Sequence, residues 1–175
     1  MDDNYKSNIL LVDDRPENLL ALEAILTSID INLVRANSGE EALRKILKEE
    51  FALILLDVQM PGMDGYETAR MIKSREKSKN IPIIFVTAIN IHQEHVVTGY
   101  SIGAIDYMCK PIEPETLKSK VEAFIKIFIN SKESIIQAEL LRKNKEELEL
   151  SNSELLRASF ELKRAEALAL SLIHI

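Results

Sequence analysis

The stretch that decides the fold is Phe51-Ala-Leu-Ile-Leu-Leu-Asp57, followed directly by Val58-Gln-Met-Pro-Gly-Met-Asp-Gly65. Its apolar residues run without a polar break up to Asp57, which is typical of a strand buried on both faces of a parallel sheet. Proline, glycine and aspartate in the second segment then interrupt the pattern and predict a turn. We therefore expect Asp57 at the carboxyl end of a central strand, where open α/β sheets carry their functional groups.

Length, composition and charge limit what the chain can be. Its 175 residues, 46% of them hydrophobic, suffice for one domain of ordinary size with an appendage. The single cysteine excludes a disulfide framework. The polar amino terminus does not resemble an export signal and no apolar run reaches membrane-spanning length, so we expect a cytoplasmic protein. The net charge of -6 argues against direct binding of nucleic acid, which needs a basic surface.

Strand and helix patterns alternate along the first part of the chain. Apolar segments predict strands over Asn8–Val12 and over residues 31–34, 51–56, 81–86 and 105–109. Helices are predicted after each strand, beginning near residues 16, 39, 66, 92 and 114, and the fourth, over residues 92–102, has the weakest pattern. Strict alternation implies right-handed crossovers, so we predict an α/β fold with a doubly wound five-stranded parallel sheet.

The helix residues expected to face the core share the spacing of one helical face. They are Leu19, Leu20, Leu22, Ile25 and Leu26, then Ala42, Leu43, Ile46 and Leu47, then Ala69 and Ile72, and finally Leu117, Val121, Phe124 and Phe128. Ser38 and Glu41 have the spacing of a capping box, which predicts the start of the second helix.

Glycine and proline divide the chain into two parts. All five glycines and all five prolines lie at or before Pro114. We therefore expect a globular domain over residues 1–128 and an uninterrupted helix over residues 129–175 that runs on from it. If this helix is continuous from Pro114, its length is about 90 Å.

Four of the five predicted strands end in a functional group, namely Asp13-Asp14, Asp57, Thr87 and Lys110. The carboxyl ends of strands in a doubly wound sheet converge on one edge, so we expect these groups to meet in one pocket. Three close carboxylates repel one another and persist most readily around a divalent cation, for which oxygen ligands favour Mg²⁺. The lysine and the threonine would complete a cradle for a phosphoryl group. The natural nucleophile is then a carboxylate, which can form an aspartyl phosphate.

Each of these residues also has an ordinary structural interpretation. Asp13 or Asp14 could cap the helix that follows, Lys110 could be a solvated strand end, and Thr87 is a residue type common in strands. Two acidic residues in tandem, with a third at the end of another buried strand, favour the site.

Three further residues with reactive side chains are not assigned to the site. We expect Cys109 to be a small buried residue rather than a redox centre. His92 and His95 lack the acidic or sulfur partners of a metal site, so we expect them to be surface histidines.

The combination of motifs resembles the receiver domain of two-component response regulators. The resemblance covers residues 7–128 and rests on Asp13-Asp14, on Asp57 with Met60-Pro61-Gly62 and Asp64-Gly65, on Thr87-Ala88 and on Lys110-Pro111. It implies the flavodoxin-like strand order 2-1-3-4-5. It also implies a signalling switch that is not an enzyme in the usual sense, because it catalyses only its own phosphorylation and dephosphorylation.

The resemblance assigns a role to each matching position. Asp57 would accept a phosphoryl group from a histidine kinase or a phosphotransfer protein, and Lys110 would pair with the phosphate. The ligands of Mg²⁺ would be Asp13, Asp14, Asp57 and the backbone carbonyl of Gln59.

The resemblance also implies a switch made of Thr87 and Tyr107. Thr87 would move toward the phosphate and Tyr107 would turn inward behind it, which changes the surface of the fourth helix, the fifth strand and the fifth helix. The alternative is that Tyr107 is a simple core residue.

The helical tail carries a repeat of seven residues. Leucines recur at 141, 148, 155 and 162, and Asn144, Ser151, Ala158 and Ala165 follow each of them by three places. These positions predict a coiled coil in which one set of core residues is leucine and the other set is polar or small. Such a pattern favours a parallel homodimer. The alternative is an isolated solvated helix, for which the balanced charges would be sufficient.

Helix-compatible residues run to the last position without a capping glycine, so we expect the natural protein to continue into an output domain absent from this chain. The leucine-rich stretch resembles the helix that precedes diguanylate cyclase domains. Histidine kinase and phosphodiesterase outputs are alternatives, and His174 could in principle be a kinase phosphoacceptor.

Two rival functions remain open. The first is an aspartyl-phosphate phosphohydrolase that acts on an external substrate. Such enzymes usually carry a second aspartate two residues after the nucleophile as a general acid, and here that position is Gln59. The second is a purely structural dimerisation module, which would not need the acidic pair or Lys110.

Overall fold

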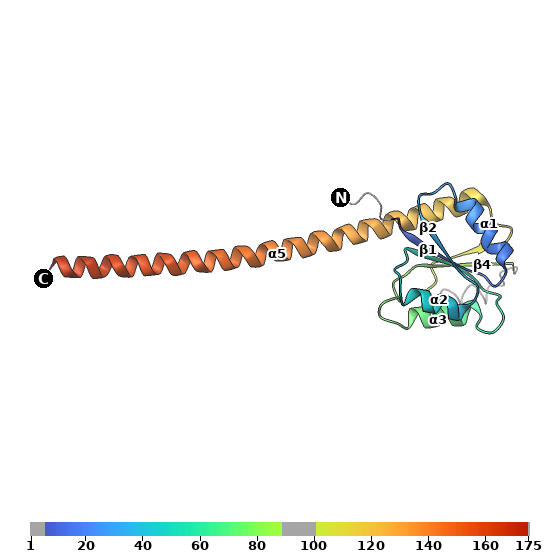
Figure 1. The fold of residues 1–175 in the computed structure, drawn as a ribbon, viewed down its shortest axis with the longest axis horizontal. Coiled ribbons are helices and arrows are strands. Elements are labelled where there is room, and N and C mark those ends of the chain that lie inside the picture. Colours follow the sequence, from blue (N-terminus) through green and yellow to red (C-terminus); the bar gives the residue numbers. More distant parts are fainter. Residues whose placement is uncertain (1–5, 89–100, 175) are drawn as a thin grey trace. The chain divides into compact units, whose positions relative to one another are not determined.

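The computed structural model describes residues 6–88 and 101–174 (Figure 1). The helix expected over residues 92–102 lies outside the described residues except at its last two positions. The described elements are, in chain order, β1 (Asn8–Val12), α1 (Pro16–Leu26), β2 (Asn32–Ala36), α2 (Gly39–Ile46), β3 (Leu53–Asp57), α3 (Gly65–Lys73), β4 (Ile83–Thr87), β5 (Asp106–Cys109) and α5 (Pro114–Ile173).

The five strands form one parallel sheet in the order β2-β1-β3-β4-β5, which confirms the predicted topology. The register pairs Val12 of β1 with Leu56 of β3, and Asp57 of β3 with Val86 of β4. Because the strands are parallel and nearly in step, their carboxyl ends reach the same edge of the sheet. Among the described residues, α1, α2 and α3 make the crossings between the first four strands, as alternating β and α elements require.

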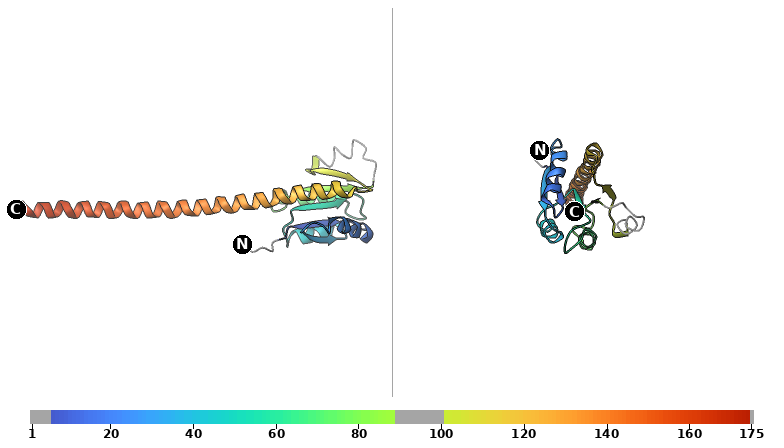
Figure 2. Two further views of the ribbon diagram at one scale, coloured as in Figure 1. Left: turned by 90° about the horizontal axis from the view of Figure 1, so that it is seen from above. Right: turned by 90° about the vertical axis from the view of Figure 1, so that its right-hand side faces the viewer.

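Among the described residues, α2 and α3 cover one face of the sheet, and α1 and the first turns of α5 cover the other (Figures 1 and 2). Alternate residues of every strand point to opposite faces, so each of the inner strands contributes to two apolar cores. Leu10, Leu56 and Phe85 pack with α2 and α3 on one face. Leu11 and Leu55 pack with α1 and the first turns of α5 on the other. This explains why β3 is apolar up to Asp57 and buried along its whole length.

Two helix residues expected in the core are exposed instead. Leu20 is 60% exposed and Leu47 is 67% exposed, so both predictions were wrong. A helix turns by about 100° per residue, and Leu19 already takes the position that faces the sheet. Leu47 is the C-cap residue of α2 and lies beyond its last buried turn. The remaining predicted helix residues are buried or packed against one of the two cores.

The start of α2 confirms the predicted cap with one difference. Ser38 accepts a hydrogen bond from the backbone N–H of Glu41 at 3.1 Å. The carboxylate of Glu41 in return accepts from the N–H of Asn37 at 2.8 Å, one residue earlier than in the standard capping box. This hydrogen bond is the main reason that the pKa of Glu41 is lowered.

The helix α5 is continuous over 60 residues. The chain divides into two compact units, Met1–Phe128 and Ile129–Ile175. Leu117 and Val121 of the first unit are fully buried, whereas every residue from 133 to 174 in the second is exposed. Among the residues that the structure describes, no helix combines the length and apolar character needed to cross a membrane.

The turn between β3 and α3 depends on a close approach at Gly65. Its N–H donates to the carbonyl of Val58 at 3.0 Å. A Cβ atom at this position would lie 2.2 Å from the carbonyl oxygen of Asp57 and 2.8 Å from the Cα of Val58. Only glycine therefore fits between α3 and the end of β3.

Replacing Gly65 with alanine should move the backbone of Asp57. We expect Gly65→Ala to lower the free energy of unfolding by about 1–3 kcal/mol, the usual cost of overpacking, and to shift the amide resonances of Asp57 and Val58. Gly103→Ala is the control, since its Cβ would meet nothing closer than a Lys73 carbon at 3.7 Å and its cost arises from a φ of 96°. Unchanged Asp57 resonances in Gly65→Ala would contradict this account of the turn.

Candidate functional site

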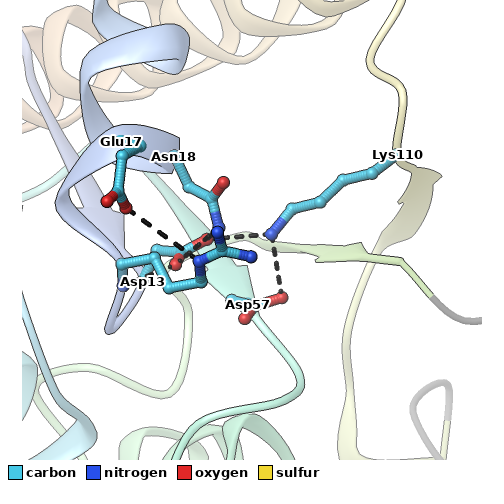
Figure 3. A network of polar contacts seen from close by, with 6 residues as sticks. Asp13, Glu17, Asn18, Asp57 and Lys110 are labelled. Atoms are coloured by element: carbon cyan, nitrogen blue, oxygen red, sulfur yellow. Dashed lines mark hydrogen bonds and ion pairs between the residues drawn. The ribbon is translucent and has the colours of Figure 1, made fainter.

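The carboxyl edge of the sheet brings together side chains from three strand ends (Figure 3). Asp13 follows β1 directly, Asp57 is the last residue of β3, and Lys110 follows β5. The ammonium of Lys110 lies 2.9 Å from Oδ2 of Asp13 and 3.3 Å from Oδ1 of Asp57. Residues separated by 97 positions in the chain are thus in direct contact.

Three carboxylates form an acidic cluster at this edge. Asp13, Asp14 and Asp57 each offer an oxygen, and these oxygens all lie within 4.8 Å of one another. Asp13 is 1% and Asp57 is 5% exposed, whereas Asp14 is half-buried. Buried like charges at this distance are costly unless cations lie among them. Lys110 supplies one positive charge to three carboxylates.

The electrostatic balance of the cluster shows in the pKa of Asp57. Burial raises the pKa of this carboxyl above its ordinary value of 3.8, and Asp13 and Asp14 raise it further. The ammonium of Lys110 lowers the pKa but does not cancel the effect of burial. The ionised form of Asp57 is therefore less stable than that of an ordinary aspartate, and a further cation would stabilise it.

The donor set fits a divalent metal ion. Carboxylate oxygens are the ligands that Mg²⁺ prefers, and three of them converge here, of which that of Asp14 is the most exposed to solvent. The fourth ligand expected, the backbone carbonyl of Gln59, belongs to the exposed residue two places after Asp57. The acidic cluster therefore has the ligand set for a cation beside the carboxylate of Asp57.

Asn18 contacts the site and was missed from the sequence. Its side-chain amide donates to Oδ1 and to Oδ2 of Asp13, both at 2.9 Å. The backbone N–H of Arg15 donates to Oδ1 of the same carboxylate at 2.9 Å. Asn18 lies in the first turn of α1, and Pro16 starts this helix two residues after Asp14. A polar residue in that turn was the available signal.

The fourth strand end also lies at this edge. Thr87 is the last residue of β4 and is 3% exposed. Its backbone carbonyl accepts a hydrogen bond from the N–H of Lys110 at 2.8 Å, which fixes where the lysine leaves the sheet.

Tyr107 on β5 is half-buried against an aromatic cluster. Its ring centroid lies 5.1 Å from that of Phe85, which in turn lies 5.0 Å from that of Tyr66. The hydroxyl of Tyr107 donates to the hydroxyl of Tyr66 at 3.3 Å. Tyr107 thus combines core packing with a polar contact to α3.

The expectation that Cys109 is buried was wrong. Cys109 is exposed. It is the last residue of β5, which is the edge strand of the sheet, and of the two residues beside it only Met108 points into a core. His92 and His95 lie outside the described residues.

Known proteins share the fold and much of the sequence. The chain is 37% identical over 124 residues to "Probable transcriptional regulator ycf27" of Pyropia yezoensis, a match that covers 71% of this chain and 49% of that protein. It is 34% identical over 151 residues to "Probable cyclic di-GMP phosphodiesterase" of Vibrio cholerae serotype O1, covering 83% of this chain and 34% of that protein. The chain therefore spans half or less of the length of these curated relatives.

A solved structure agrees with these relatives. The chemotaxis protein CheY4 of Vibrio cholerae superposes with a TM-score of 0.64 at 29% identity, covering 69% of this chain and 99% of CheY4. The family model of the response regulator receiver domain matches residues 9–122. The fold, the strand order and these matches agree, and the chain belongs to the family of response regulator receiver domains.

Proposed function

We propose that this chain is a phosphorylation-controlled switch whose phosphoryl acceptor is Asp57. The observation that carries the proposal is the acidic cluster of Asp13, Asp14 and Asp57 with Lys110 in contact with two of its members. Receiver domains of two-component systems imply a histidine kinase or a phosphotransfer protein as the phosphoryl donor. The function is then signal transduction, in the cytoplasm as expected from the sequence.

Transfer requires Asp57 to act as a nucleophile. A carboxylate oxygen of Asp57 attacks the phosphorus of the donor, the bond between phosphorus and the donor histidine breaks, and the imidazole leaves with its electron pair. The ammonium of Lys110, 3.3 Å from Oδ1, lies within reach of a phosphoryl group on that oxygen. The chain would catalyse its own modification, so it is not an enzyme in the usual sense.

Asp13, Asp14, Asp57 and the carbonyl of Gln59 would hold Mg²⁺ in this reaction. When bound, Mg²⁺ neutralises negative charge on the carboxylates and on the phosphoryl oxygens. The raised pKa of Asp57 supports this assignment, since burial, its main cause, disfavours the ionised carboxylate that a bound cation would stabilise.

The switch would connect the phosphoryl group to the far side of the sheet. Thr87 ends β4, and its carbonyl accepts the N–H of Lys110. Tyr107 lies one strand away on β5, in register with Phe85 of β4. We propose that movement of Thr87 is followed by Tyr107, whose contact with Tyr66 would then change.

The rival phosphohydrolase receives less support. A general acid would have to be placed beside Asp57, and the residue two places on is an exposed glutamine, Gln59. No other carboxylate among the described residues joins the cluster of three.

The second unit would carry the signal as a parallel coiled coil. Leu141, Leu148, Leu155 and Leu162 are each between 62% and 69% exposed in a single chain, and burying such side chains contributes roughly 2 kcal/mol each. Three ion pairs among the described residues of this unit join Arg142 to Glu146, Lys145 to Glu149 and Arg157 to Glu161, and none of these residues is at a predicted core position. A homodimer would therefore bury the leucines and leave the charges solvated, and it would pass the change to an output domain. Diguanylate cyclase remains the sequence-based prediction for that domain.

Acetyl phosphate should modify Asp57 in the presence of Mg²⁺. We expect intact-mass spectrometry to show one added phosphoryl group on the full chain, lost in Asp57→Asn and reduced at least about tenfold in rate in Lys110→Ala. Asp30→Asn, which changes an exposed aspartate, is the control. Modification of Asp57→Asn at the rate of the unmodified sequence would contradict the assignment.

Stability should depend on pH and on Mg²⁺ through Asp57. Because the pKa of Asp57 is raised in the folded state, the folded protein binds more protons than the unfolded chain from pH 3.8 up to that raised pKa. The contribution of Asp57 to the free energy of unfolding is thus present at low pH and is lost as pH rises through this window.

Two comparisons test this linkage by denaturant unfolding. Without metal at neutral pH, Asp57→Asn should be more stable than the unmodified sequence, whereas Asp30→Asn should change little. Mg²⁺ at 100 times its dissociation constant should stabilise the unmodified protein by about 2.7 kcal/mol and should have much less effect on Asp57→Asn. Equal stabilisation of both proteins would contradict the site.

The coiled coil can be tested with two leucines of equal exposure. Leu148 and Leu150 are both 62% exposed in the single chain, but only Leu148 lies at a predicted core position. We expect Leu148→Lys to shift the protein from dimer to monomer in sedimentation equilibrium, and Leu150→Lys to leave the dimer intact. A monomer for the unmodified sequence, or equal effects of the two substitutions, would contradict the predicted core.

A further inference from the structure

Asn18 makes the most complete contact with Asp13 of any residue in the described structure. Its Nδ2 lies 2.9 Å from both carboxylate oxygens (Figure 3). The N–H of Arg15 reaches only Oδ1, and Nζ of Lys110 reaches only Oδ2. With 1% exposure, Asp13 has almost no water to replace a lost donor. The orientation of this carboxylate therefore depends on the three donors, and Asn18 alone contacts both oxygens.

The chemistry of the amide suits a site crowded with charge. A lysine or arginine at this position would add a cation that competes with a metal ion, and an aspartate would add a fourth carboxylate. An amide donates hydrogen bonds without changing the net charge. Because Asn18 is held by the first turn of α1, its donor is fixed by the fold rather than by a flexible stem.

We propose that Asn18 is a positioning residue that holds the Asp13 carboxylate toward the metal and phosphoryl site. The inference rests on the proposed function, in which Lys110 pairs with a phosphoryl group on Asp57 and shares less of its charge with Asp13. Asn18 and the N–H of Arg15 are the contacts of Asp13 that this change leaves in place. Polar groups that orient metal-binding carboxylates in this way commonly affect metal affinity by about tenfold or more when removed.

The test is the affinity of the full chain for Mg²⁺ alone, measured by isothermal titration calorimetry. Asn18→Leu removes the amide while keeping the branched shape, and Asn18→Ala removes it with less bulk. We expect both to weaken Mg²⁺ binding by about tenfold, and Asn18→Gln, which restores an amide, to recover part of the loss. Leu20→Ala, an exposed substitution on the same helix, should bind as the unmodified sequence does.

Thermal unfolding of each variant separates positioning from a purely structural role. If Asn18→Leu and Asn18→Ala both lower the melting temperature but bind Mg²⁺ within twofold of the unmodified sequence, the inference is overturned while the proposed function stands. If one of these two variants fails to fold, the Mg²⁺ affinity of the other decides the test. If the unmodified sequence does not bind Mg²⁺, or binds it equally after Asp57→Asn, the proposed function and this inference fall together.

Discussion

The contact of Lys110 with both Asp13 and Asp57 is the interaction on which the rest of the site depends. Two almost fully buried carboxylates side by side are costly in a protein interior unless a cation accompanies them. Lys110 follows β5, which is separated from β3 by β4, so only a long side chain can reach across. The sheet order and the length of a lysine together place one positive charge among three negative ones.

Apolar packing supplies the rigidity that this arrangement needs. Because β1, β3 and β4 are buried on both faces, their ends cannot shift independently, and the functional groups at those ends are held in register. The glycine at position 65 allows α3 to approach the end of β3 closely, so the turn after Asp57 is held against it. The rigid strands hold the three carboxylates close together even though these carboxylates repel one another. Excess negative charge at a fixed position is what allows a cation or a phosphoryl group to change the state of the domain.

Much of this was predictable from the sequence, for identifiable physical reasons. A strand buried on both faces has no polar break, and turn residues mark its end, so Asp57 could be placed at the edge of the sheet before any coordinates were known. Side-chain direction was harder, because Leu20 and Leu19 are equally apolar and only the rotation of the helix against the sheet decides which is buried. The prediction that Cys109 is buried was wrong for a related reason, since the sequence does not reveal which residues at the end of an edge strand are exposed. Asn18 was missed because a polar residue in the first turn of a helix is a weak signal, and its role becomes visible only when the position of Asp13 is known.

The most direct measurement of the central claim is a crystal structure of the full chain with Mg²⁺ and beryllofluoride, which mimics a phosphoryl group on a carboxylate. The account predicts beryllofluoride on a carboxylate oxygen of Asp57 in contact with Lys110 and Thr87. It also predicts Mg²⁺ held by the acidic cluster and the carbonyl of Gln59. Beryllofluoride at another residue, or Mg²⁺ bound away from Asp13, Asp14 and Asp57, would contradict it.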